Sequence, residues 1–288
     1  MPSAIVDGIK TRYEIVGDGP PLLMYAPGGF DATIEKWRSL GVYARIRLLE
    51  HLPKKFQCIA FDRRECGESG GRVEAMTWAH YARQGKLLLE HLGIDRAQLI
   101  GGCMGCSCVT AFAAAYPRST LSMILWWPVG GAKYRMRGRQ RFAEHLSFVR
   151  SSNLSAVVSH VEKEQKAFNV DSKAGPWASP IRADAEFRKS FRGQDVKRYL
   201  EIVEKMGKTL LDRDTSPGAE PEELMQLQIP ALIVPGRDES HAGSAARYLE
   251  ECLPKSQYWD VPPEAQTEAN APARLLEFLL DVDREAAR

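Results

Sequence analysis

The segment around Cys103 places a nucleophilic side chain between small residues. Residues 101–105 read Gly-Gly-Cys-Met-Gly, so glycines stand two positions before and two positions after the cysteine. A side chain presented on a sharp strand-to-helix turn needs small residues at both positions, because the backbone is crowded there. The dipole and free N–H groups of the following helix favour an anion, and the N–H of Met104 would point at an oxyanion. We therefore expect Cys103 to be a reactive nucleophile.

The elements that would position this turn alternate along the chain. Short apolar runs bounded by Gly or Pro are typical of strands buried on both faces, and amphipathic stretches between them are typical of helices. The runs are 21–27, 56–62, 97–102, 121–127, 230–236 and 257–262, and the helical patterns are 33–52, 77–92, 104–116, 241–253 and 272–286. This alternation predicts an α/β fold, with a mostly parallel central sheet flanked by helices.

The alternation stops between residues 129 and 226, where helical patterns occur without a strong strand signal. A helical insert between two strands usually lies over the carboxyl edge of the sheet, where ligands bind in open α/β folds. We therefore expect a core formed by residues 1–128 and 227–288, and a helical lid formed by 129–226. A few additional packing helices are the alternative.

Three more segments, together with the Cys103 turn, resemble the α/β-hydrolase fold family over nearly the whole chain. Residues 25–30 (YAPGGF) are similar to its oxyanion loop, residues 62–69 (DRRECGES) to its D-x-R-G-x-G-x-S loop, and residues 235–238 (PGRD) to the strand end that carries its acid. The resemblance implies an oxyanion hole formed by Met104 together with Gly29 or Phe30.

Two departures from the family pattern bear on activity. Cys103 stands where the family usually has serine, so a small buried cysteine in an inactive protein is an alternative to a nucleophile. The loop after the last strand, which carries the family's histidine, reads VPPEAQTEAN over residues 261–270 and contains no histidine. The base must therefore come from another segment.

His241 is the histidine best placed to be that base. It follows Asp238 by three residues, after the strand before the last, so it should share a sheet edge with Cys103. A catalytic triad is defined by geometry and not by sequence order. We expect His241 to be oriented by Asp238, or by Glu264 from the following loop. Capping of the next helix is the alternative role of His241.

This set of residues predicts acyl transfer through a Cys103 thioester. A thiolate suits activated acyl groups, so we expect a small ester, lactone, thioester or β-dicarbonyl substrate. Arg64 would bind a substrate carboxylate, and Trp127 and Trp177 would form an apolar wall. Residues 133–141 carry five cations, but their i, i+2 spacing favours a solvated helix face. A lyase, an acyltransferase and a non-catalytic ligand-binding protein remain alternatives.

Composition limits the partners. The chain has 288 residues, with 39 basic and 37 acidic side chains and a net charge of +2, which gives no reason to expect nucleic acid or a membrane as partner. We found no secretory signal and no membrane-spanning run, and expect a cytoplasmic protein with free cysteines. Cys103, Cys106 and Cys108 lack a nearby histidine, so no metal and no cofactor is expected. The sequence does not fix the oligomeric state, and a homodimer stays open.

Overall fold

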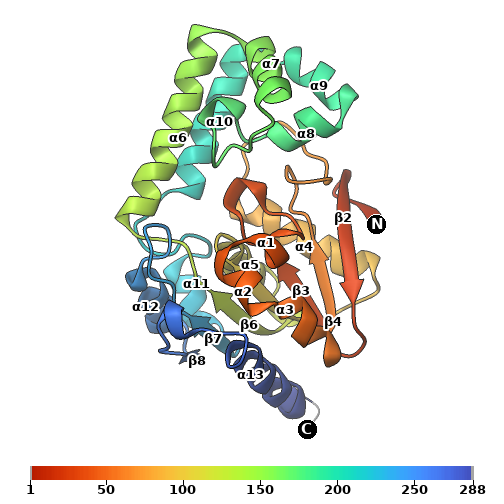
Figure 1. The fold of residues 1–288 in the computed structure, drawn as a ribbon, viewed down its shortest axis with the longest axis vertical. Coiled ribbons are helices and arrows are strands. Elements are labelled where there is room, and N and C mark those ends of the chain that lie inside the picture. The colour runs from red at the N-terminus through yellow and green to blue at the C-terminus, as the bar shows by residue number, and fades with distance from the viewer. Residues whose placement is uncertain (1, 287–288) are drawn as a thin grey trace.

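The central sheet of the computed structural model, which describes residues 2–286, has eight strands in the order β1-β2-β4-β3-β5-β6-β7-β8 (Figure 1). The strands are β1 (Ser3–Val6), β2 (Ile9–Val16), β3 (Pro21–Tyr25), β4 (Gln57–Phe61), β5 (Ala97–Gly102), β6 (Thr120–Trp126), β7 (Ala231–Val234) and β8 (Ser256–Tyr258). From β4 to β8 all neighbours pair in parallel, whereas β1 and β2 pair antiparallel at one edge. The predicted fold class is confirmed.

Alternating strand residues divide the core into two layers. Leu23 and Leu99 pack in one apolar cluster, whereas Leu22 and Ile100 pack in the other. The first layer is covered by α4 (Trp78–His91), α5 (Gly105–Ala115) and α12 (Gly243–Cys252), and the second by α1 (Lys36–Ser39), α2 (Gly41–Ile46), α3 (Leu48–His51) and α13 (Ala271–Ala286). Both faces of the sheet are buried, which explains why its central strands read as continuous apolar runs.

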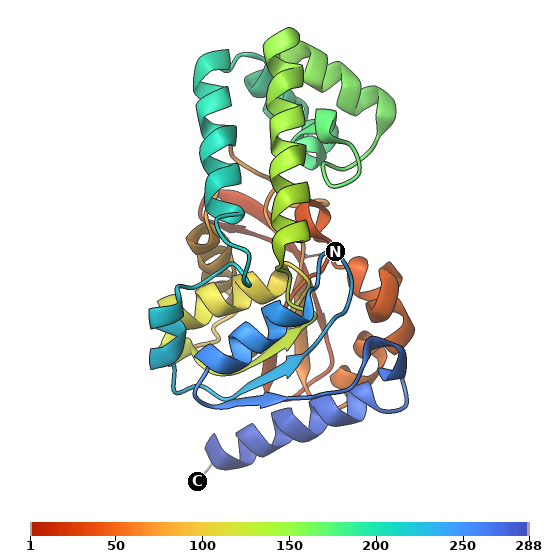
Figure 2. The ribbon, with the colours of Figure 1, turned by 90° about the vertical axis from the view of Figure 1, so that its left-hand side faces the viewer.

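A helical insert follows β6 and extends away from the sheet (Figures 1 and 2). It contains α6 (Ala132–Ser151), α7 (Leu154–Glu164), α8 (Ala178–Ala183), α9 (Ala185–Arg192) and α10 (Val196–Leu210). Helices α6 and α10 pack side by side along its length. The next helix, α11 (Pro221–Gln226), packs instead against α5 and α12, so the end of the predicted lid segment belongs with the core.

Single turns of 3-10 helix complete the fold: η1 (Gly29–Asp31), η2 (Leu52–Lys54), η3 (Pro117–Ser119), η4 (Ser172–Ala174) and η5 (Pro263–Ala265). No helix within residues 2–286 combines the length and the apolar character that a membrane crossing requires.

Candidate active site

Cys103 lies on the tight turn between β5 and α5. Its φ is 54°, a left-handed conformation that is strained for a residue with a side chain. A Cβ atom on Gly101 would lie 2.4 Å from the carbonyl oxygen of Gly105, and one on Gly105 would lie 2.4 Å from the carbonyl oxygen of Tyr25. The flanking glycines are therefore required by close backbone contacts, as the sequence suggested.

The surroundings of Cys103 favour its thiolate form. Burial alone would raise the pKa of the thiol, but the charge and hydrogen bonding of His241 and the backbone N–H groups of Gly28 and Met104 hold this pKa below its ordinary value. The helix N-terminus at Met104 contributes in the same direction. The Cys103 thiol is thus more acidic than an ordinary cysteine thiol.

The two neighbouring cysteines have the opposite character. Cys106 is buried, and its thiol donates to the carbonyl oxygen of Gly101 at 3.1 Å, while Cys108 donates to that of Met104 at 3.6 Å. Burial raises the pKa of Cys106 well above its ordinary value and that of Cys108 to about 11. In the part of the chain that the structure describes, no three His, Cys, Asp or Glu side chains are grouped to hold a metal ion.

The oxyanion loop comes from the segment after β3. Gly28, Gly29 and Phe30 line the same cavity as Cys103 and Met104. Gly28 has a φ of 115°, which only glycine adopts readily. Sequence reasoning pointed to Gly29 and Phe30, whereas the structure adds the N–H of Gly28 as a group that favours the Cys103 thiolate.

His241 is held at the carboxyl edge of the sheet by a short β-bridge to Gly130. The N–H of Gly130 donates to Ser240, and the N–H of Ala242 donates back to Gly130, at 3.0 and 3.4 Å. Gly236 leaves space for the ring, since a Cβ atom there would lie 2.6 Å from that of His241. These contacts bring His241 and Cys103 to one cavity.

Asp238 orients the His241 ring. Nδ1 of His241 lies 2.8 Å from both carboxylate oxygens of Asp238, which also accepts the N–H groups of Ser240 and His241. The hydrogen bond from His241 lowers the pKa of Asp238 to about 2. A carboxylate at Nδ1 requires the proton there, which leaves Nε2 to serve as the base.

Nε2 of His241 is buried and has no nitrogen or oxygen partner among the described residues, and the group that interacts with it is the Cys103 thiol. Burial opposes protonation of the ring, but the Cys103 thiolate and Asp238 outweigh it and raise the pKa of His241 above its ordinary value. A lowered thiol pKa beside a raised imidazole pKa describes a thiolate–imidazolium pair.

Glu264, the other carboxylate considered, does not reach His241. It lies exposed on η5 and makes no hydrogen bond or ion pair with His241 within residues 2–286. The buried residue of that loop is Gln266, whose Oε1 accepts from Nε1 of Trp127 at 2.8 Å. The Trp127 ring lies 5.5 Å from the His241 ring, so Gln266 fixes the ring that packs against His241.

Replacing Gln266 should lower the stability of the protein and change the surroundings of His241. Gln266→Met removes the acceptor of the Trp127 N–H. It also removes Nε2 of Gln266, which donates to the carbonyl oxygens of Pro235 and Val261 at 2.9 Å each. We expect a loss of about 1–3 kcal/mol in the free energy of unfolding, measured by urea denaturation. We also expect the pH dependence of Cys103 alkylation to shift upward. Alkylation that follows the wild-type pH curve would limit Gln266 to a structural role.

The active-site cavity has a volume of about 310 Å³. Its walls combine the oxyanion loop, the Cys103 turn, the His241 loop and the insert; they are Gly28, Gly29, Phe30, Lys36, Leu40, Cys103, Met104, Val129, Tyr134, Arg137, Gly138, Arg141, Asn169, Leu211, Ser240 and His241. Its size and its position at the ends of parallel strands suit a small-molecule ligand.

Arg64 does not line this cavity, which corrects the expectation that it binds substrate. It is buried, its Nε donates to Glu65 at 3.0 Å, and its Nη2 forms an ion pair with Glu74. Glu65 stands where the family has glycine, with a φ of 65°. These two carboxylates neutralise Arg64 away from Cys103.

The two tryptophans are likewise absent from the cavity lining. Trp177 is fully buried within the insert, where Nε1 donates to the carbonyl oxygen of Arg72 at 2.9 Å and the ring packs against Tyr199. Trp127 packs behind His241, as described above. Their large apolar surfaces are used for packing, and the expected apolar wall is not formed by them.

Sequence reasoning missed most of the remaining cavity residues, among them Tyr134, Arg141 and Asn169. The first two lie in the cation-rich stretch 133–141, which was interpreted as a solvated face. Asn169 follows the predicted helix over 153–168 and carried no signal of its own. The helical pitch brings Tyr134, Arg137 and Arg141 to one side of α6, because residues three and four apart share a face.

Comparison with known proteins agrees with the fold described above. The model of the family described as alpha/beta hydrolase fold matches residues 21–263. The dihydrolipoyllysine-residue acetyltransferase component of the acetoin cleaving system of Cupriavidus necator is 28% identical over 127 residues, which are 44% of this chain and 32% of that protein. The match therefore spans about a third of that relative's length.

Two solved structures are similar over nearly their whole length. MGS-M2, an alpha/beta hydrolase enzyme from a Medee basin deep-sea metagenome library, has a TM-score of 0.63 and 18% identity, covering 96% of this chain and 97% of that one. The enol-lactonase from Burkholderia xenovorans has a TM-score of 0.59 and 19% identity, covering 97% and 100%. These likenesses concern the fold.

Proposed function

The chain belongs to the α/β-hydrolase fold family, and we propose that it hydrolyses a small activated acyl substrate with Cys103 as nucleophile, His241 as base and Asp238 as orienting acid. The observation that carries this proposal is the buried imidazole of His241, which lines the cavity of Cys103 and interacts with its thiol while Asp238 holds Nδ1. The backbone N–H groups at Met104 and in the loop Gly28–Phe30 form the oxyanion hole.

The first half of the reaction forms a thioester. The Cys103 thiolate attacks the carbonyl carbon, and the oxyanion accepts hydrogen bonds from backbone N–H groups. When the tetrahedral intermediate collapses, the bond to the leaving group breaks and the His241 imidazolium gives its Nε2 proton to that group. The acyl group is then bound to sulfur, and His241 is neutral.

The second half of the reaction releases the acid. Nε2 of His241 takes a proton from water, and the hydroxide adds to the thioester carbonyl. Collapse expels the Cys103 thiolate, which restores the thiolate–imidazolium pair. In this proposal the insert acts as a lid, since α6 provides Tyr134, Arg137, Gly138 and Arg141 to the cavity wall.

Intact-protein mass spectrometry tests this proposal directly. After mixing with p-nitrophenyl acetate, we expect one acetyl group on the peptide that contains Cys103, and nitrophenolate release with an initial burst followed by steady turnover. The adduct should decay at the rate of turnover. A protein that releases no more nitrophenolate than buffer would contradict hydrolysis, and a permanent adduct would indicate a protein that lacks a deacylating base.

A further inference from the structure

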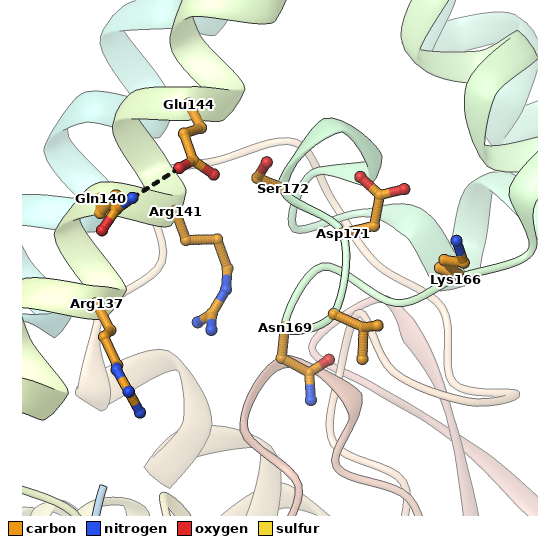
Figure 3. A pocket seen from close by; sticks show the side chains of 9 residues that line it. Arg137, Gln140, Arg141, Glu144, Lys166, Asn169, Asp171 and Ser172 are labelled. Atoms are coloured by element: carbon orange, nitrogen blue, oxygen red, sulfur yellow. Dashed lines mark hydrogen bonds between the residues drawn. The ribbon is translucent and has the colours of Figure 1, made fainter. Parts of the chain in front are cut away.

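Arg141 lies at the junction of two cavities. The outer cavity, of about 520 Å³, is lined by Arg137, Gln140, Arg141, Glu144, Lys166, Asn169, Val170, Asp171 and Ser172 (Figure 3). Arg137, Arg141 and Asn169 also line the active-site cavity, so the two hollows adjoin. In Figure 3 the Arg141 side chain extends from α6 into the space facing Asn169. A ligand held by Arg141 would therefore lie on the path to Cys103.

The charge of Arg141 is not neutralised. The other charged groups of the outer cavity each contact a polar neighbour: Arg137 contacts Glu239, Lys166 contacts Glu164, Asp171 contacts His160 and Glu144 contacts Gln140. Within residues 2–286, Arg141 makes neither a hydrogen bond nor an ion pair, and its guanidinium carbon lies 6.0 Å from the centre of the Phe168 ring. Among the described residues no carboxylate forms an ion pair with its guanidinium, and Glu144 acts on it only at longer range.

Partial burial makes the lack of an ion-pair partner energetically unfavourable for Arg141. Arg141 is half-buried, and burial lowers the pKa of its guanidinium, while the neighbouring Tyr134 and Glu144 act in the opposite direction. A partly desolvated cation recovers the lost hydration when it meets an anion with matched hydrogen bonds. A bound anion would supply what the protein itself does not.

Asn169 provides a second unsatisfied group at the same junction. Its Nδ2 donates to the carbonyl oxygen of Gly28 at 3.2 Å, which fixes the amide against the oxyanion loop. Its Oδ1 is buried and has no hydrogen-bond partner among the described residues. Buried acceptors are nearly always satisfied in folded proteins, so this oxygen is available to a hydrogen-bond donor on a ligand or to water.

We propose that Arg141 binds a carboxylate of the substrate, so that the natural substrate is a small anionic ester or thioester. The planar guanidinium fork of Arg141 matches a carboxylate in a bidentate arrangement, whereas Oδ1 of Asn169 is an acceptor and is left to water. The position of the ester at Cys103 rests on the proposed function, whereas the carboxylate site does not depend on catalysis.

Hydrolysis of matched probes tests the specificity. The probes are neutral p-nitrophenyl acetate and two anionic esters, mono-p-nitrophenyl glutarate with the carboxylate on the acyl side and 4-acetoxybenzoate with it on the leaving group. We expect the wild-type ratio of kcat/KM, anionic over neutral, to fall about 10- to 100-fold in Arg141→Ala for at least one anionic probe. Arg141→Lys, which keeps the charge but not the fork, should give an intermediate ratio.

Arg150→Ala is the matched control, because it removes the same charge from the exposed far end of α6. Its ratio should equal that of the wild type. If Arg141→Ala does not fold, as judged by circular dichroism, Arg141→Gln replaces it. Equal ratios in the wild type and in a folded Arg141 variant would overturn the carboxylate site.

A binding measurement on a protein without the Cys103 thiol tests the carboxylate site independently of the proposed hydrolysis. In the Cys103→Ala protein, titration calorimetry with glutarate should show binding that weakens at least about tenfold when Arg141→Ala is added. Such binding in a protein that hydrolyses none of the three esters would retain the anion site and reject the proposed reaction. Tighter binding of inorganic phosphate than of glutarate, or no binding of glutarate, would reject the carboxylate assignment.

Discussion

Cys103→Ala should reduce the hydrolysis of p-nitrophenyl acetate at least about 10⁴-fold, because Cys103 is the cavity residue that combines a lowered thiol pKa with the backbone N–H groups of Gly28 and Met104. The oxyanion loop and the His241–Asp238 pair remain in this variant, so activity should fall nearly to that of buffer. Steady-state release of nitrophenolate measures the loss, and intact mass spectrometry should show no acyl adduct.

Cys106→Ala is the control for this experiment. Cys106 lies one turn away on α5, with a thiol that donates to Gly101 and a pKa well above the ordinary value. It should therefore keep turnover within about threefold of the wild type, since a protonated buried thiol is not a nucleophile. If Cys106→Ala lost the acyl adduct and Cys103→Ala kept it, the nucleophile would be Cys106, and the assignment to Cys103 would be wrong.

His241→Ala should lower turnover about 10²- to 10⁴-fold, the usual contribution of a general acid–base residue. It should also change the thiol. The His241 charge lowers the pKa of Cys103 against the effect of burial, so its removal should raise that pKa above the ordinary value. Alkylation by iodoacetamide at neutral pH should slow, and should recover at alkaline pH where the thiol ionises.

The sign of this shift distinguishes a base from a helix cap. Above the lowered pKa of Cys103 and below the raised pKa of His241, the wild type holds the thiolate–imidazolium pair, so kcat/KM should be bell-shaped with these two limits. His51→Ala is the control, because His51 pairs with Glu268 at 2.8 Å. An unchanged alkylation profile in His241→Ala would contradict the role of His241.

The central strands were predictable from sequence because both faces of the sheet are buried. The run 97–102 is β5, and the run 121–127 lies within one residue of β6 (Thr120–Trp126). The first two strands, β1 and β2, were not predicted, since Lys10, Thr11 and Arg12 interrupt their apolar pattern. The packing of α11 on α5 and α12 was not predicted, because these contacts join segments that are far apart in the sequence.

Only part of the candidate site could be predicted from the sequence. The turn at Cys103 depends on local backbone crowding, so its glycines identify it in the sequence. Asp238 and Glu264 could not be ranked as partners of His241, because the choice depends on how the loop folds back on the Asp238 carboxylate. Arg64 follows a strand end and Arg141 lies in the middle of α6, and only tertiary contacts show that Glu65 and Glu74 pair with the first while the second forms no ion pair among the described residues.

The β-bridge between Gly130 and His241 joins the start of the helical insert to the segment that carries this histidine. Gly130 and Gly131 have φ values of 153° and 99° and form the root from which α6 rises, while Gly130 shares two hydrogen bonds with the segment that carries His241. The start of α6 and the segment that carries His241 are therefore joined by the same two backbone hydrogen bonds. The placement of the insert and the placement of the imidazole are set at one point of the structure.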